Sequence, residues 1–189
     1  MNPDQLSAPA RRADAERNRA RILAAARSAF ADPQAEVSMA EVSRRAGVGM
    51  ATLYRNFPGR RELLEALYID EVNAVCEAAE TLEAETHGAL LVAWLRRFFA
   101  FITSKHPVGI ELLKDSGGRA PVMGESRRRV MEAARPLLRA AQRTHQVRED
   151  LTLEQVLDMI VAIAAIHGKP DYVEPILQAA LDGLRNPDA

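Results

Sequence analysis

Two short segments with helical periodicity lie side by side in this chain, separated only by residues 47–49, Gly-Val-Gly. The first segment, 39–46, follows Ser38, and Glu41 three residues later completes the pattern of a capping box. Gly47 can adopt the positive φ that a tight exit from a helix requires. Because three residues leave room only for a turn, the pattern predicts a helix-turn-helix, whose second helix can lie in the major groove of DNA.

Helical spacing of apolar residues continues on both sides of this pair, and no sheet is predicted. One helix is predicted before the pair, over 14–31, and residues 1–13 are predicted to form a flexible arm. The helices predicted after it cover 60–84, 88–103, 108–113, 125–146, 151–167 and 171–185. The pattern therefore predicts an all-α fold of eight or nine helices.

Two prolines are expected to interrupt these helices, because proline lacks the N–H that a helix interior needs. The first lies in His106-Pro107 and is expected to end the helix over 88–103. The second, Pro136, lies within 125–146 and predicts a kink or break near Glu132.

The net charge of −1 conceals an uneven distribution. Residues 1–61 carry eleven Arg and six acidic residues, whereas residues 62–189 carry fourteen basic and twenty acidic residues. A basic region on an acidic body is expected when one end of a protein contacts a polyanion. The single cysteine, Cys76, excludes an internal disulfide framework and a multi-cysteine zinc site.

The residues around the turn resemble the DNA-binding signature of the tetracycline-repressor (TetR) family of transcriptional regulators. The signature positions are in register here and hold Ala46-Gly47-Val48, Thr52-Leu53-Tyr54, Phe57, Arg60 and Leu63-Leu64. With the first helix of the family, which Arg21 to Ala26 and Phe30 match, the resemblance covers about residues 17–68. It implies an N-terminal three-helix DNA-binding domain over 14–60, and a C-terminal helical domain for effector binding and dimerisation over 61–189.

The resemblance also implies which residues contact DNA. Phosphate contacts of the family usually come from positions that here hold Ser38, Thr52, Tyr54, Asn56 and Arg60, whose side chains can all donate to phosphate oxygens. Base contacts usually come from positions that here hold Arg44, Gly49, Met50, Ala51 and Arg55. An Arg can bind guanine bidentately, and Met50 or Ala51 can touch a thymine methyl. Gly49 replaces the more usual Ser and Asn56 the commoner His, and Tyr54 could instead pack while Arg44 or Arg55 could simply be solvated.

In the C-terminal half, the resemblance implies a small-molecule pocket and a homodimer built by the last two helices. Apolar and histidine side chains could line the pocket, although each could equally belong to the core. The candidate pocket residues are Trp94, Phe98, Ile102, His106, Met123, Met131, His145, Met159, Ile163 and His167.

The dimer prediction has independent support in the apolar surface of these last two helices. Residues 159–166 are apolar on every face, and the final helix carries a wide apolar stripe, which is more than a monomer usually exposes to water. Pairing with symmetry mates in a four-helix bundle would bury this surface. The candidate interface residues are Met159, Ile160, Ile163, Ile166, Val173, Ile176, Leu177, Ala180, Leu181 and Leu184.

Together these features predict a homodimeric regulator that binds double-stranded operator DNA. The primary prediction is that it is a repressor, which a small-molecule effector releases from the operator. An activator of the same fold, and an effector-binding protein without operator binding, remain alternatives. An enzyme is not expected, because the four His lie far apart and Cys76 has no visible activating partner. We therefore expect no metal and no cofactor. Since no run approaches the roughly 20 apolar residues of a membrane span, a cytoplasmic location is expected.

Overall fold

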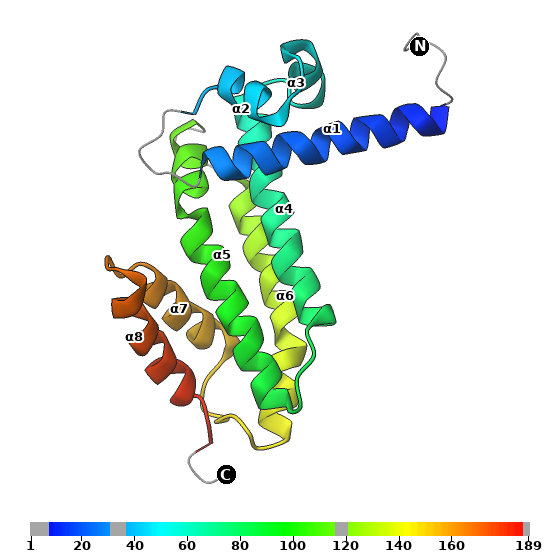
Figure 1. Ribbon diagram of the computed structural model, residues 1–189. Helices are drawn as coiled ribbons and strands as arrows, with labels where there is room; N and C mark the ends of the chain where they lie inside the picture. The colour runs from blue at the N-terminus through cyan, green and yellow to red at the C-terminus, as the bar shows by residue number, and fades with distance from the viewer. Residues whose placement is uncertain (1–7, 31–36, 116–120, 187–189) are drawn as a thin grey trace. The chain divides into compact units, whose positions relative to one another are not determined.

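A computed structural model describes residues 8–30, 37–115 and 121–186 of the chain. Within these ranges the protein is all-α and forms eight helices, as predicted, with one isolated β-bridge (Figure 1). The helices are α1 (Ala8–Ala29), α2 (Met39–Ala46), α3 (Met50–Asn56), α4 (Arg60–Thr81), α5 (His87–Asp115), α6 (Pro121–Arg143), α7 (Leu153–Ala164) and α8 (Pro170–Asp182). None of these described helices combines the length and apolar character needed to cross a membrane.

The chain divides into two compact units whose boundary lies inside two of the helices. Unit 1 comprises Met1–Tyr68 and Pro107–Arg119, and unit 2 comprises Ile69–His106 and Ala120–Ala189. The predicted boundary at residue 60 therefore falls eight residues before the break, and the end of α5 belongs with the first unit, which the sequence pattern did not indicate.

Several helix boundaries differ from the predicted ones. α1 begins at Ala8, so residues 8–13 of the predicted arm are helical, while residues 1–7 of that arm lie outside the described ranges. The predicted end of this helix at residue 31 also lies outside them.

The predictions that Pro107 ends a helix and that Pro136 breaks one are wrong, while the kink predicted as the alternative at Pro136 stays a prediction. α5 continues through Pro107, and α6 continues through Pro136 without a break at Glu132. A proline removes one backbone donor, but burial of the residues that follow offsets that loss. Val108 and Leu112 are buried after the first proline, and Leu137 and Leu138 after the second.

Unit 1 has a small core formed where α1, α2 and α3 pack on one another. Ile22 of α1, Leu53 of α3 and Leu64 of α4 are fully buried there. A buried hydrogen bond stabilises the turn between α2 and α3, because the Ser43 hydroxyl donates to the Val48 carbonyl at 2.6 Å. This core holds α3 with one face inward and the other in solvent.

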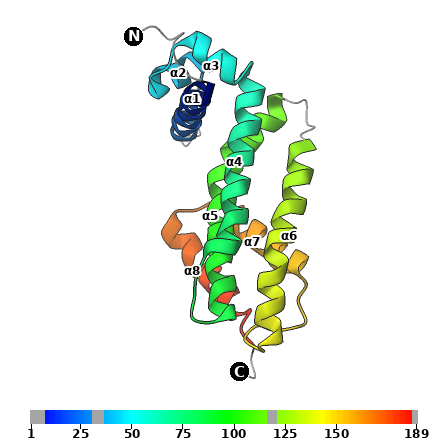
Figure 2. The same ribbon diagram turned by 90° about the vertical axis from the view of Figure 1, so that its right-hand side faces the viewer.

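Unit 2 has a larger core in which α5 carries the aromatic residues. Trp94 is fully buried, its indole N–H donates to the Val75 carbonyl of α4 at 3.0 Å, and its ring stacks on Phe98 at a centroid distance of 5.5 Å. α7 and α8 pack on each other, and α8 is tied to α5 by the ion pair of Arg96 with Glu174 at 2.7 Å. Figure 2 shows the ribbons of α7 and α8 beside α5.

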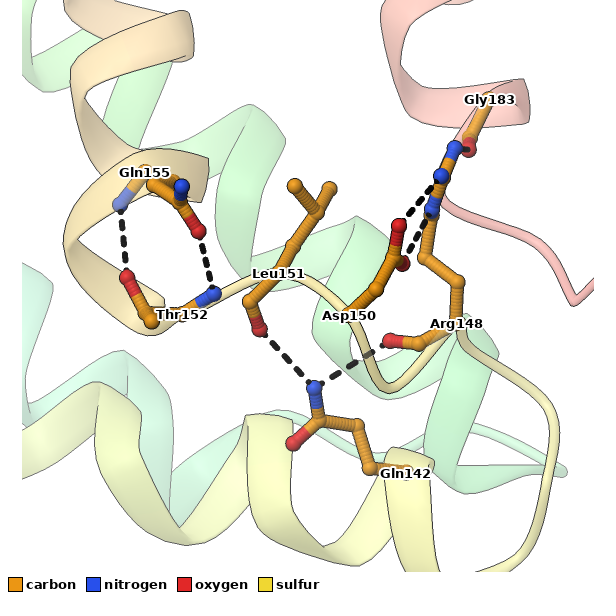
Figure 3. A network of polar contacts seen from close by, with 7 residues as sticks. All are labelled: Gln142, Arg148, Asp150, Leu151, Thr152, Gln155 and Gly183. Carbon is orange, nitrogen blue, oxygen red and sulfur yellow. Dashed lines mark hydrogen bonds and ion pairs between the residues drawn. The ribbon is translucent and has the colours of Figure 1, made fainter.

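The connection between α6 and α7 is held by a polar network (Figure 3). The Gln142 amide donates to two carbonyls of this connection, at 3.2 and 3.1 Å. Arg148 pairs with Asp150 through two bonds of 2.6 Å, and it reaches the carbonyl at the C-cap of α8 at 3.5 Å. Thr152 and Gln155 form a reciprocal capping box that starts α7. The network therefore brings the start of α7 and the end of α8 to the same point.

Candidate nucleic-acid interface

The start of α2 has the cap that the sequence predicts. Ser38 is the N-cap residue in extended conformation, and its hydroxyl accepts from the Glu41 N–H at 3.1 Å. The Glu41 carboxylate binds two arginines of the same helix, Arg44 at 2.7 Å and Arg45 at 2.6 Å. The hydrogen bonds from Arg44 and then Arg45 lower the pKa of Glu41 to about 2 from 4.5.

The end of α2 requires the glycine that the sequence places there. Gly47 has φ +62°, the left-handed region in which a side chain is strained, and its N–H donates to the Arg44 carbonyl at 3.2 Å. A Cβ at this position would also lie 2.8 Å from a guanidinium nitrogen of Arg21. Two residues later Gly49 is the N-cap of α3, with φ −70° and open space within 4 Å of the point that a Cβ would occupy.

α3 presents one apolar face to the core and a mixed face to solvent. Leu53 and the C-cap residue Phe57 are at most 1% exposed, whereas Met50 is 39% and Tyr54 46% exposed. The remaining predicted residues of α3 are exposed, or half-buried at its edges, namely Ala51, Thr52, Arg55 and Asn56. The predicted side chains of α3 therefore lie on or beside one outward face, where a base edge or a phosphate can reach them.

Two of the predicted contact residues, one on α3 and one on α2, bind partners close by in sequence. The Asn56 amide donates to the Thr52 carbonyl at 2.8 Å, which holds the end of α3. Arg44 is exposed on α2 but already paired with Glu41, so a base contact by Arg44 would have to compete with that carboxylate.

Arg60 differs from the other predicted contacts because the partners of its guanidinium come from other segments of unit 1, far away in sequence. It donates to the Val37 carbonyl, pairs with Glu111 at 2.7 Å and lies 5.1 Å from the centre of the Phe30 ring. Glu111 comes from the end of α5, 51 residues away in sequence, and no local pattern indicates it. A phosphate contact at Arg60 would have to share or displace these partners.

Two arginines of α1 that the sequence analysis did not select contact both ends of α3. Arg21 donates to the Gly47 carbonyl at 3.2 Å, at the turn that precedes α3. Arg19 lies 4.6 Å from the centre of the Phe57 ring, at the C-cap of α3. Arg19 continues the buried face of α1 toward the N-terminus, whereas Arg21 lies beside that face, and helical spacing was the only signal of either position in the sequence.

In unit 2 the candidate pocket residues differ in exposure. Trp94, Phe98, Met131 and Ile163 are buried, while Ile102, Met123 and Met159 are half-buried. His145 is exposed in the connection after α6, where it pairs with Glu149 at 3.0 Å. The side chain of His106 lies outside the described residues.

His167 is the candidate that lines a cleft. This cleft has a volume of about 660 Å³ and lies between α5 and the turn that joins α7 to α8. Phe99, Ile166 and Val173 contribute apolar surface to it, and Asp171 contributes a carboxylate.

The candidate dimer residues also divide into two groups. Those turned into the core of their own chain are Ile160, Ile163, Val173, Leu177, Leu181 and Leu184, each at most 8% exposed. Those half-buried at the surface are Met159, Ile166, Ile176 and Ala180. The most exposed large apolar side chains of α7 and α8 are others, Val161 at 38% and Tyr172 at 63%. Packing within the chain therefore takes up most of the apolar stripe that the sequence assigned to a partner.

Comparison with known proteins agrees with this geometry. Residues 22–67 match the family described as "Bacterial regulatory proteins, tetR family", and residues 86–186 match "Transcriptional regulator SbtR-like, C-terminal domain". A search of the curated proteins found no match.

Two solved structures resemble the whole chain. A TetR transcriptional regulator from Streptomyces coelicolor is 35% identical, with a TM-score of 0.76 over 89% of this chain and 99% of that one. A TetR transcription regulatory protein from Mycobacterium vanbaalenii is 32% identical, with a TM-score of 0.75 over 92% of this chain and 98% of that one. With its capped helix-turn-helix and its helical C-terminal half, this chain belongs to the TetR family of bacterial transcriptional regulators.

Proposed function

We propose that the protein is a cytoplasmic repressor that binds operator DNA as a homodimer and leaves it when a small-molecule effector binds unit 2. The observation that carries the proposal is the outward face of α3, held between the Gly47 turn and the buried Phe57. In a helix-turn-helix this is the face that enters the major groove. The basic excess of residues 1–61 supports contact with the phosphate backbone.

The DNA contacts that we propose follow from the exposure of each side chain. Tyr54 is the best placed phosphate contact, because it is 46% exposed on α3. Ser38 and Thr52 would supply further phosphate contacts, and Met50, Ala51 and Arg55 would meet base edges. Arg44 and Arg60 would contribute only after their carboxylate partners, Glu41 and Glu111, release them.

Dimerisation through α7 and α8 is supported by the apolar side chains that remain at the surface. Val161 and Tyr172 are exposed, and Met159, Ile166, Ile176 and Ala180 are half-buried. A two-fold symmetric dimer carries two copies of α3, and the recognition helices of such dimers bind successive major grooves, about 34 Å apart.

The cleft beside His167 is the site that we propose for the effector. Its volume of about 660 Å³ is within the range of small-molecule sites, and its walls are mainly apolar with a few polar groups. Release from DNA requires the effector to bind the DNA-competent and incompetent forms with different affinities.

The test is selection of genomic DNA fragments by the purified full chain, followed by titration of the selected fragments. Enriched fragments should share an inverted repeat, the mark of a two-fold symmetric dimer. Tyr54→Ala should weaken binding to all of them roughly tenfold for each protomer in contact with DNA, since each loses a hydrogen bond to a charged group of about 1.5 kcal/mol. Met50→Ala should instead change the preference among fragments.

A folded Tyr54→Ala protein with unchanged affinity would reject the assignment of Tyr54. A wild-type protein that enriches no fragment would reject operator binding and favour the effector-binding alternative. A reporter gene placed behind a selected fragment separates repression from activation, because expression should rise when the protein is removed.

A further inference from the structure

α1 is 22 residues long, and the described side chains that it buries in the core of unit 1 lie from Ile22 onward. Ile22 and Phe30 are buried, and they lie on one helical face. In steps of three and four residues, the same face continues toward the N-terminus as Arg19, Ala15 and Arg12. The stripe that packs against the protein from Ile22 onward therefore carries two Arg over residues 12–21, which we call the exposed half of α1.

Arg19 shows which way this face points. Its guanidinium lies over the ring of Phe57, the C-cap of α3, so the face is turned toward the helix-turn-helix. Arg12 precedes Arg19 by seven residues and therefore lies on the same side of α1, about 10 Å farther along its axis. Figure 1 shows this half of α1 extending past the end of α3.

The exposed half of α1 has the composition of a surface that meets a polyanion. All of residues 12–21 are described, and each is exposed or half-buried. They contain four Arg against two acidic residues, and their only apolar residues are Ala, so they offer a membrane or an apolar partner nothing to bury. A helix of this length is marginal in water without a partner. Its position beside α3 indicates that the partner is DNA.

We propose that the exposed half of α1, residues 12–21, is a second DNA contact, in which Arg12 and Arg19 bind phosphates beside the segment read by α3. The proposal rests on the proposed function, because it requires α3 to be seated on DNA. The contact carries no base readout, since guanidinium groups on phosphates contribute affinity and register rather than sequence preference.

Arg12→Ala tests the contact, with Arg17→Ala as the matched control. Both residues are exposed on the same helix, and both variants remove one positive charge. Arg17 lies about 140° around the helix from Arg12 and is already paired with Asp14. Alanine is the best helix former, so neither variant should lower the helical content, which circular dichroism checks.

The measurement is titration of a duplex that the wild-type protein has selected from random-sequence DNA, repeated at several salt concentrations. Arg12→Ala should bind roughly threefold to tenfold more weakly, and its slope of log K against log salt should be shallower by about 0.9 for each phosphate that the variant no longer neutralises. Arg17→Ala should keep the wild-type slope. A shorter duplex, trimmed to the segment that the Arg12→Ala protein protects from nuclease digestion, lacks the phosphate that Arg12 would bind. On this duplex the wild-type protein should bind no more tightly than the variant.

Equal effects of Arg12→Ala and Arg17→Ala would overturn the proposal, because they would show only a change in net charge. An Arg12→Ala protein that binds as the wild type does would overturn it as well, while leaving operator binding by α3 intact. A wild-type protein that selects no duplex would overturn both this contact and the proposed function.

Discussion

Units 1 and 2 differ in what determines the environment of their important side chains. In unit 1 the outward face of α3 is set within residues 38–57, by the Ser38 cap, the Gly47 turn and the buried Leu53. In unit 2 the environment depends on partners far apart in sequence, such as Trp94 with Val75 and Arg96 with Glu174. Local chemistry therefore defines the DNA-facing surface, whereas tertiary packing decides which apolar residues of the C-terminal half remain at the surface.

The same difference applies to the predicted functional residues, which are the DNA contacts in unit 1 and the pocket and dimer residues in unit 2. The side chains proposed to contact DNA are exposed because of their register on one short helix. The candidate dimer residues were selected by helical spacing as well, yet six of the ten are buried in the core of unit 2. A spacing pattern identifies an apolar face, but it cannot say whether the same chain or a partner covers that face.

The largest expected effect tests the role of packing in unit 2. Leu177 is 1% exposed, so Leu177→Glu should unfold unit 2 at a cost of about 4 kcal/mol or more for a buried unpaired charge. Val161 on α7 is 38% exposed, so Val161→Glu should remain folded and shift the protein from dimer to monomer. Urea denaturation and sedimentation of both variants distinguish the two outcomes. A folded Leu177→Glu protein would show that unit 2 is not held by this core.

The fold could be predicted from the sequence wherever a run of apolar residues had one unambiguous period. All eight helices correspond to predicted segments, and α2, with its Ser38 cap and Gly47 exit, has the predicted bounds. The helices do not end at Pro107 or break at Pro136, because the burial of the following turns offsets the missing hydrogen bond.

The candidate site was predictable in its position but not in its ion pairs. The exposed face of α3 follows from the spacing of Leu53 and Phe57, and the resemblance supplied the roles. The partner of Arg60 is Glu111, and no rule based on neighbouring residues connects α4 with the end of α5. The stacking of Arg19 on Phe57 was missed for the same reason, since it joins two helices that are far apart in sequence.

A second, smaller effect tests whether unit 1 depends on local backbone chemistry. Gly47→Ser should destabilise the protein by about 1–2 kcal/mol, because the residue has φ +62° and its Cβ would displace the Arg21 guanidinium. Gly49→Ser is the matched control, since its φ is −70° and the site is open. A Ser there can cap α3, so it should stabilise by a few tenths of a kcal/mol, about the usual advantage over Gly.

Urea unfolding followed by circular dichroism measures both glycine variants. Equal effects at the two positions would contradict the role of the left-handed conformation at Gly47. They would also weaken the comparison between the units, because the turn would then depend on packing rather than on backbone geometry.

The smallest effect concerns the cluster of Glu41, Arg44 and Arg45 on α2, an interaction that is wholly local in sequence. The pKa of Glu41 is lowered from 4.5 to about 2, first by the hydrogen bond from Arg44 and then by that from Arg45. The unfolded chain therefore takes up this proton at a higher pH than the folded chain. The resulting stability is present above about pH 4.5 and is lost as the pH falls toward 2.

Glu41→Gln should accordingly be less stable than the wild type at pH 7, and the difference should shrink between pH 4.5 and 2. Urea titrations at low salt, at several pH values, measure it, since salt screens exposed pairs. A difference that stays constant down to pH 2 would mean that the charged form of Glu41 contributes nothing to the stability of unit 1.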